Sequence, residues 1–136
     1  MTISAEASSI TRRTSATSAL ALRHATSSAR ILLSLIFMTT GLAKLFGMGT
    51  MVHLFHTIGL GEELRYAAGL AEVGAALLLI MPAGHFLGGL LVGLLSLSAV
   101  VAHVIVTGES LFPAAAFLML ALFVIWRTRP ESWRHL

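Results

Sequence analysis

Three ionisable residues lie inside apolar stretches of this sequence, namely Lys44, Glu72 and His103. A charged side chain near the centre of a bilayer costs about 2.5–3.5 kcal/mol on insertion scales, so such residues are the first candidates for chemistry. At about 1.5 Å per helical residue, all three would lie in the external half of a membrane, on three different segments. An inward-facing arrangement would bring an ammonium, a carboxylate and an imidazole together as a ligand or proton site.

The same three residues also have a structural interpretation. Lys44 would extend its ammonium to the lipid headgroups, while Glu72 and His103 would hydrogen-bond neighbouring helices. A lipid-facing position without any role is the third alternative. Glu72 carries the sharpest signal, because Gly69 and Gly74 flank it and small residues let another helix approach closely.

The composition indicates an integral membrane protein. The 136 residues are 57% hydrophobic and 11% charged, whereas a soluble domain has roughly a quarter charged residues. A short chain has too much surface for its volume to hide so much apolar material, which excludes a soluble enzyme domain. The chain has no cysteine, which excludes thiolate catalysis and Cys-ligated metals. Its net charge of +3 comes from residues near the two ends, so we expect no nucleic-acid partner.

Four apolar segments predict an all-α, polytopic membrane four-helix bundle. A helix needs about 20 residues to cross the hydrocarbon layer, and lipid favours helices because they satisfy their own backbone. Pro82 and Gly84 separate the second segment from the third, and Gly108 separates the third from the fourth, which is slightly short. The segments cover residues 31–48, 64–81, 85–107 and 113–126.

The distribution of arginine predicts the orientation of the chain. Four arginines precede the first segment and three follow the fourth, whereas the loops on the opposite side of the membrane contain only Arg65. By the positive-inside rule, we expect both termini to face the cytoplasm. We therefore divide the chain into a weakly ordered cytoplasmic tail (1–29, with a helix over 16–29), a transmembrane domain (30–128) and a cytoplasmic tail (129–136). A twin-arginine signal or a presequence is the weaker interpretation of the start, and no Ala-x-Ala cleavage site follows it.

The loop after the first segment has the spacing of a short amphipathic helix lying at the interface. Its apolar positions are Met51, Leu54, Phe55 and Ile58, and its polar positions are His53, His56 and Thr57. The two histidines invite a metal interpretation, but metal sites usually need three or four ligands. We therefore predict an interfacial polar face and no metal site.

Gly84, Gly88, Gly89 and Gly93 give the third segment two small-xxx-small pairs. This spacing is typical of close helix crossings. We favour packing within the bundle, and a homodimer seam or a groove for a ligand is the alternative.

Several short motifs in this chain resemble those of the DoxX-like proteins, which are small four-helix bacterial membrane proteins. The resemblance covers about residues 30–128 and lies in the stretches 40–45, 54–60, 68–79 and 99–103. It implies a multi-pass location in a bacterial inner membrane. It also implies a link to membrane thiosulfate:quinone oxidoreductases or to oxidative-stress and sulfur-handling complexes, although many members have no assigned activity. Lys44 and Glu72 match recurrent polar positions of the family, and His103 matches less closely.

These observations favour an accessory or quinone/small-ligand-binding subunit of a membrane redox system. Quinone is the candidate cofactor, and the candidate partners are a membrane oxidoreductase, a second copy of the chain and the lipid bilayer. We assign no catalytic residue and expect no catalytic activity of the chain alone. The alternatives are a structural membrane helper without a ligand and a small proton-coupled transporter. Small multidrug exporters carry their membrane glutamate in the first helix, where this chain has Lys44.

Overall fold

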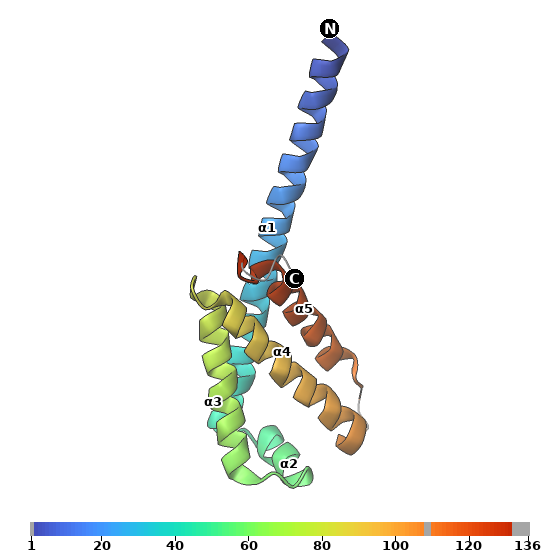
Figure 1. Ribbon diagram of the computed structural model, residues 1–136. Coiled ribbons are helices and arrows are strands. Elements are labelled where there is room, and N and C mark those ends of the chain that lie inside the picture. Colours follow the sequence, from blue (N-terminus) through green and yellow to red (C-terminus); the bar gives the residue numbers. More distant parts are fainter. Residues whose placement is uncertain (1, 108–109, 132–136) are drawn as a thin grey trace.

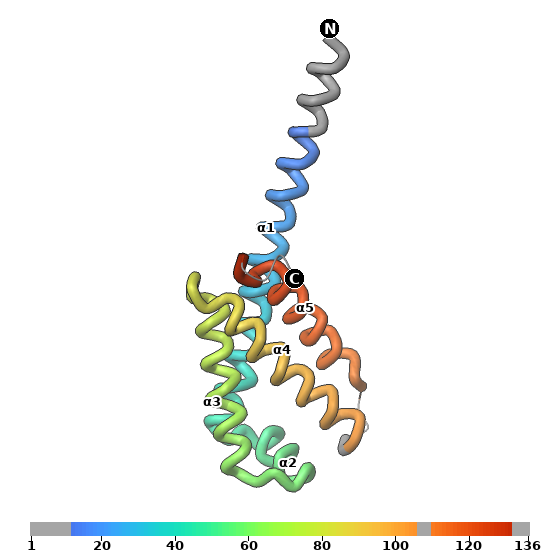
Figure 2. Tube along the Cα trace, in the orientation of Figure 1, coloured from blue at the N-terminus to red at the C-terminus, as the bar shows by residue number. Residues whose placement is uncertain are grey.

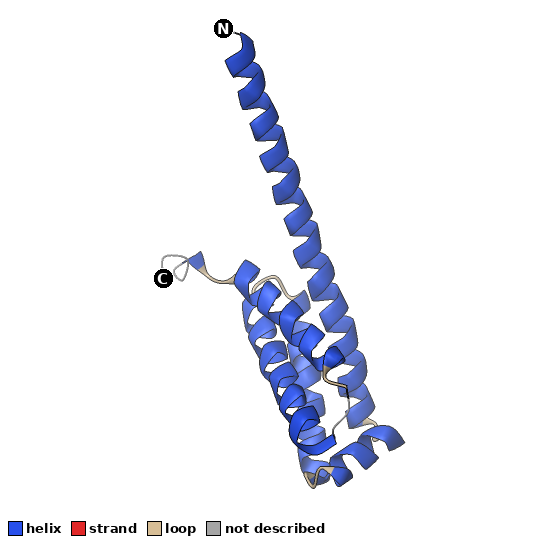
Figure 3. Cartoon of the chain, turned by 90° about the vertical axis from the view of Figure 1, so that its right-hand side faces the viewer, coloured by secondary structure: helices blue, strands red, loops and turns tan. Residues whose placement is uncertain are grey.

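The computed structural model describes the backbone of residues 2–107 and 110–131, and the side chains of residues 12–105 and 110–131. The α-helices are α1 (Thr2–Leu45), α2 (Gly49–Thr57), α3 (Gly61–Ile80), α4 (His85–Ala102) and α5 (Phe112–Thr128), and a π-helical turn, η1 (His103–Thr107), continues α4. No strand occurs in this described part of the chain (Figure 3). The all-α fold predicted from the sequence is confirmed.

Helix α1 begins at Thr2 and continues without a break through the predicted tail and the first apolar segment. No glycine or proline interrupts residues 2–40, so nothing in the sequence ends the helix there. Its serines and threonines bond back to their own helix, as Ser18 Oγ does to Ser15 O at 2.9 Å and Thr26 Oγ1 to Leu22 O at 2.8 Å. The helix predicted over 16–29 is part of α1, because the change of composition near residue 30 does not terminate a helix.

Residues 12–25 of α1 stand clear of the other helices (Figures 1 and 2). Every side chain from Arg12 to Ala25 is exposed, and burial begins at Thr26. From that point α1, α3, α4 and α5 pack around one core, whose fully buried side chains include Leu33, Leu79, Val92 and Val124.

Gly84, which caps the start of α4, and the three glycines within α4 are all buried inside the chain. A Cβ on Gly88 would lie 2.7 Å from the backbone nitrogen of Leu79 in α3, so the two backbones are in direct contact. On the opposite face, a Cβ on Gly89 would lie 3.2 Å from the Ile125 side chain of α5. Gly84 and Gly93 make the matching contacts with α3 and α5, respectively. The glycines therefore allow α4 to fit between two neighbours, and a homodimer seam stays a prediction.

Helix α2 lies across the opposite end of the bundle from the start of α1 (Figure 1) and packs against α3. Its Phe55 is buried, and Met51 and Leu54 are half-buried. His53 and His56 are exposed. The amphipathic helix predicted from the sequence is confirmed, and contact of α2 with the membrane surface stays a prediction.

Two described helices are long and apolar enough to cross a membrane, spanning Arg12–Leu45 and His85–Ile105. The apolar helix Phe112–Thr128 is shorter. The start of α1 and the end of α5 lie at the same end of the bundle (Figure 1), as an even number of crossings would require.

Candidate functional site

Helices α1 and α3 touch through two glycines. A Cβ added to Gly41 would lie 2.9 Å from the carbonyl oxygen of Gly69, and a Cβ on Gly69 would lie 2.9 Å from the carbonyl oxygen of Gly41. Real Cβ atoms do not approach a backbone oxygen so closely, so only glycine at both positions allows this crossing. The sequence signal of small residues around Glu72 therefore identified a true helix contact.

This crossing brings Lys44 and Glu72 together. Lys44 Nζ lies 2.9 Å from both Oε1 and Oε2 of Glu72. Thr40 Oγ1 donates a further hydrogen bond of 2.9 Å to Glu72 Oε2. The two charged side chains are each only 12% exposed. We name these three residues the Thr40–Lys44–Glu72 cluster.

Helix geometry explains how residues on either side of the crossing meet. Helical side chains tilt toward the N-terminus of their own helix, so Lys44 reaches back past Gly41 toward the level of Thr40. There it faces Glu72, which lies one turn after Gly69 in α3. Two opposite charges in such a sheltered position stabilise one another, and removing one would leave the other without compensation.

Arg65 is a buried residue of α3 that the sequence reasoning missed. Arg65 is only 2% exposed, which is as low as the exposure of the apolar core residues. Its Nη1 donates to the carbonyl oxygen of Lys44, and its guanidinium lies 4.3 Å from the ring centroid of Tyr66. The sequence analysis placed Arg65 in an external loop, and that placement is wrong. The sequence does contain a signal for this position. Arg65, Gly69 and Glu72 follow the i, i+4, i+7 spacing that places residues on one face of a helix.

The contact of Arg65 explains how α1 ends beside the site. The last four carbonyls of a helix have no partner within the helix, and Arg65 supplies a donor for one of them. Gly47 then turns the chain with φ +64°, a left-handed conformation that favours glycine. Arg65 thus holds the backbone that carries Lys44.

His103, the third residue predicted for this site, is the first residue of η1 and is half-buried. His103 makes an interaction of its own there. The hydrogen bonds that form the Thr40–Lys44–Glu72 cluster join only those three residues. Short π-helical turns are frequent at functional sites. A functional role for His103 therefore stays a prediction.

The described residues contain no group of three or more His, Asp or Glu side chains arranged to hold a metal ion. His53 and His56 lie on the exposed face of α2.

The fold is a bundle of helices, two of which are long and apolar enough to cross a membrane, and it carries an ion pair where α1 crosses α3. Comparison with protein families makes the assignment more specific, because the DoxX family model matches residues 25–108, more than half of the chain. The chain therefore belongs to the DoxX family. The matched region includes Lys44, Arg65, Glu72 and His103 and stops before α5. Comparisons with the curated proteins and with the solved structures gave no match.

Proposed function

We propose that this DoxX protein is an accessory subunit of a membrane redox system and that it binds a quinone or a similar small carbonyl ligand at the Thr40–Lys44–Glu72 cluster. The observation that carries the proposal is the sheltered Lys44–Glu72 pair, 12% exposed on each side. Ionisable groups inside a membrane domain are costly and mark ligand or proton pathways by default. Membership of the DoxX family supports a membrane role.

The cluster has the hydrogen-bonding capacity that a quinone headgroup needs. An ammonium has three N–H donors, and Glu72 has two oxygens to accept them, so Lys44 can donate to a ligand carbonyl while it keeps its ion pair. Glu72 and Lys44 together can hold or exchange a proton next to that carbonyl. Electrons would come from a membrane oxidoreductase partner, since a chain without cysteine has no thiol to supply them.

The tail of such a ligand would lie on the outer surface of the helix crossing. The α4 glycines, which the sequence analysis considered as a groove, are occupied by contacts with α3 and α5.

A structural role without a ligand is the second candidate, and one observation favours it. Both oxygens of Glu72 already accept hydrogen bonds within the chain, from Thr40 and Lys44. A satisfied pair of this kind can simply hold α1 against α3.

The test compares Glu72→Gln with Glu63→Gln, which makes the same chemical change at an exposed position of the same helix. Each protein is purified from native membranes, its quinone content is measured by solvent extraction and chromatography, and its melting temperature is recorded. We expect quinone to copurify with the wild type and with Glu63→Gln and to be lost from Glu72→Gln, whose melting temperature should fall only slightly because its amide oxygen keeps the hydrogen bond from Thr40. Absence of quinone from the wild type, or equal quinone in all three proteins, would refute the proposal in favour of the structural role.

A further inference from the structure

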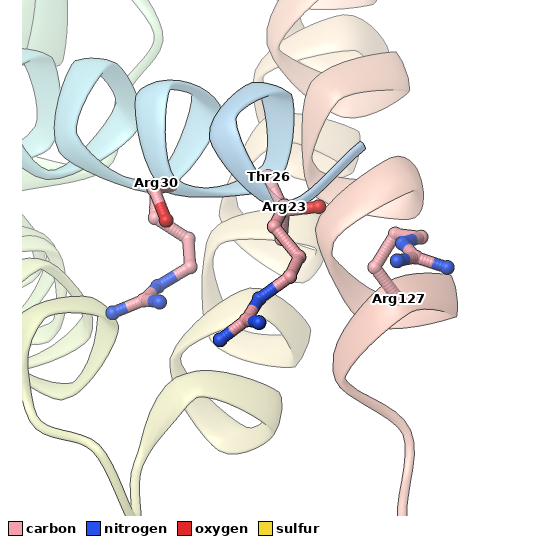
Figure 4. Close-up of a pocket in the computed structure, with 5 residues that line it drawn as sticks. Arg23, Thr26, Arg30 and Arg127 are labelled. Atoms are coloured by element: carbon pink, nitrogen blue, oxygen red, sulfur yellow. The ribbon is translucent and has the colours of Figure 1, made fainter. Parts of the chain in front are cut away.

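A basic groove lies at the end of the bundle opposite α2. Its volume is about 270 Å³, and it is lined by Arg23, Thr26, Ser27, Arg30 and Arg127 (Figure 4). The first four residues follow the i, i+3, i+4, i+7 spacing that places them on one face of α1. Arg127 comes from α5, which packs beside α1. None of the five lining residues is acidic.

Two of the arginines are fixed in place before any ligand binds. Arg30 Nε donates to the carbonyl oxygen of Leu79 at 3.0 Å, and its Nη2 contacts His85 Nε2. Arg127 stacks near the Trp126 ring, 5.8 Å from its centroid, and its Nε is buried without a hydrogen-bond partner. Figure 4 shows Arg23 and Arg30 extending the same way from α1, and Arg127 beside them on α5 with its guanidinium turned away from theirs.

A second hollow, of about 280 Å³, adjoins the basic groove. It shares Ser27 and Arg30 with the groove and is otherwise lined by Ile31, Leu79 and Ile80. Ile31 and Ile80 are each 59% exposed, so this surface is apolar and accessible. A cationic hollow and an apolar hollow with a common border fit a ligand that has an anionic head and a hydrocarbon tail.

We propose that this pair of hollows binds an anionic phospholipid, with its phosphate in the basic groove and one acyl chain along Ile31 and Ile80. Arginine forks match the geometry of phosphate oxygens, and basic pockets between membrane helices are known to take anionic headgroups. A free phosphate would use only the basic groove and would leave the apolar hollow unexplained. The site is separate from the Thr40–Lys44–Glu72 cluster and does not depend on the function proposed for it.

The test measures lipid binding to the purified full chain by native mass spectrometry, with phosphatidylglycerol and phosphatidylcholine of identical acyl chains as probes. The groove variant combines Arg23→Gln with Arg127→Gln. The control combines Arg12→Gln with Arg13→Gln, which removes the same charge from exposed positions earlier in α1. We expect the wild type and the control to bind phosphatidylglycerol at least about tenfold more tightly than phosphatidylcholine, and the groove variant to lose this preference.

Equal binding of the two lipids by the wild type would overturn the proposal, as would an equal loss of preference in the control. If the double variant folds poorly, Arg23→Gln alone replaces it, because Arg23 is exposed and its substitution should not disturb folding. This single variant must also weaken the preference for phosphatidylglycerol over phosphatidylcholine. Inorganic phosphate is the third probe. If it competes with phosphatidylglycerol at concentrations equal to those of the lipid, the ligand is a free phosphate, and the assignment to a lipid is wrong.

Discussion

Pairing of Lys44 with Glu72 predicts a specific pattern of stability in a double-mutant cycle. Glu72→Ala leaves the Lys44 ammonium without its partner and removes the acceptor of Thr40. Breaking a buried ion pair in this way typically costs about 3–5 kcal/mol. Because each side chain here is 12% exposed, water can reach the abandoned ammonium, and we expect a loss near the lower end, about 3 kcal/mol.

The second variant of the cycle, Lys44→Met, keeps much of the side-chain length and removes the charge. In the background of Glu72→Ala it should restore part of the lost stability, because no unpaired charge remains. The expected coupling energy is about 1–3 kcal/mol, within the range measured for residues in direct contact. Glu72→Gln should be milder than Glu72→Ala, since its amide oxygen can still accept the hydrogen bond from Thr40.

The assay is reversible unfolding in mixed detergent micelles, followed by circular dichroism, for the wild type, both single variants and the double variant. Glu63→Ala serves as the control, because it removes an exposed carboxylate from the same helix. Additive effects of the two single substitutions would show that the ammonium and the carboxylate do not stabilise one another. The cluster would then lose its physical basis as a site.

Three further predictions concern other parts of the chain. A reporter fused after Leu136 should show a cytoplasmic location, since seven arginines flank the predicted inner face, and a periplasmic signal would reverse the assigned orientation. Replacing His53 and His56 together by Gln should leave folding and metal content unchanged, whereas stoichiometric zinc lost only from this variant would establish a metal site. Gly41→Ala should destabilise the protein by about 1–3 kcal/mol in the same unfolding assay, because its Cβ would lie 2.9 Å from a backbone oxygen of α3. Gly74→Ala has open space around its Cβ and should be neutral or slightly stabilising, so equal effects at the two glycines would contradict the close crossing.

The helical fold could be predicted from the sequence because its signals are local. Long apolar segments separated by proline and glycine lead to helices, and the regular spacing of Leu54 and Phe55 against His53 and His56 defines the two faces of α2. The pairing of Lys44 with Glu72 was also within reach, because charges inside apolar helices need a partner and small residues mark where the helices approach.

Other features depended on how the helices cross. Arg65 looks like a loop residue beside two glutamates, yet the end of α1 lies over it and buries it to 2% exposure. The glycines of α4 carry a spacing that suits a dimer as well as a bundle, and only the positions of α3 and α5 show that they pack within the chain. Arg30 and Arg127 are almost a hundred residues apart, and they share one groove because α5 returns to the side of α1. Contacts between such distant residues depend on the geometry of the whole bundle, which the local pattern of side chains does not specify.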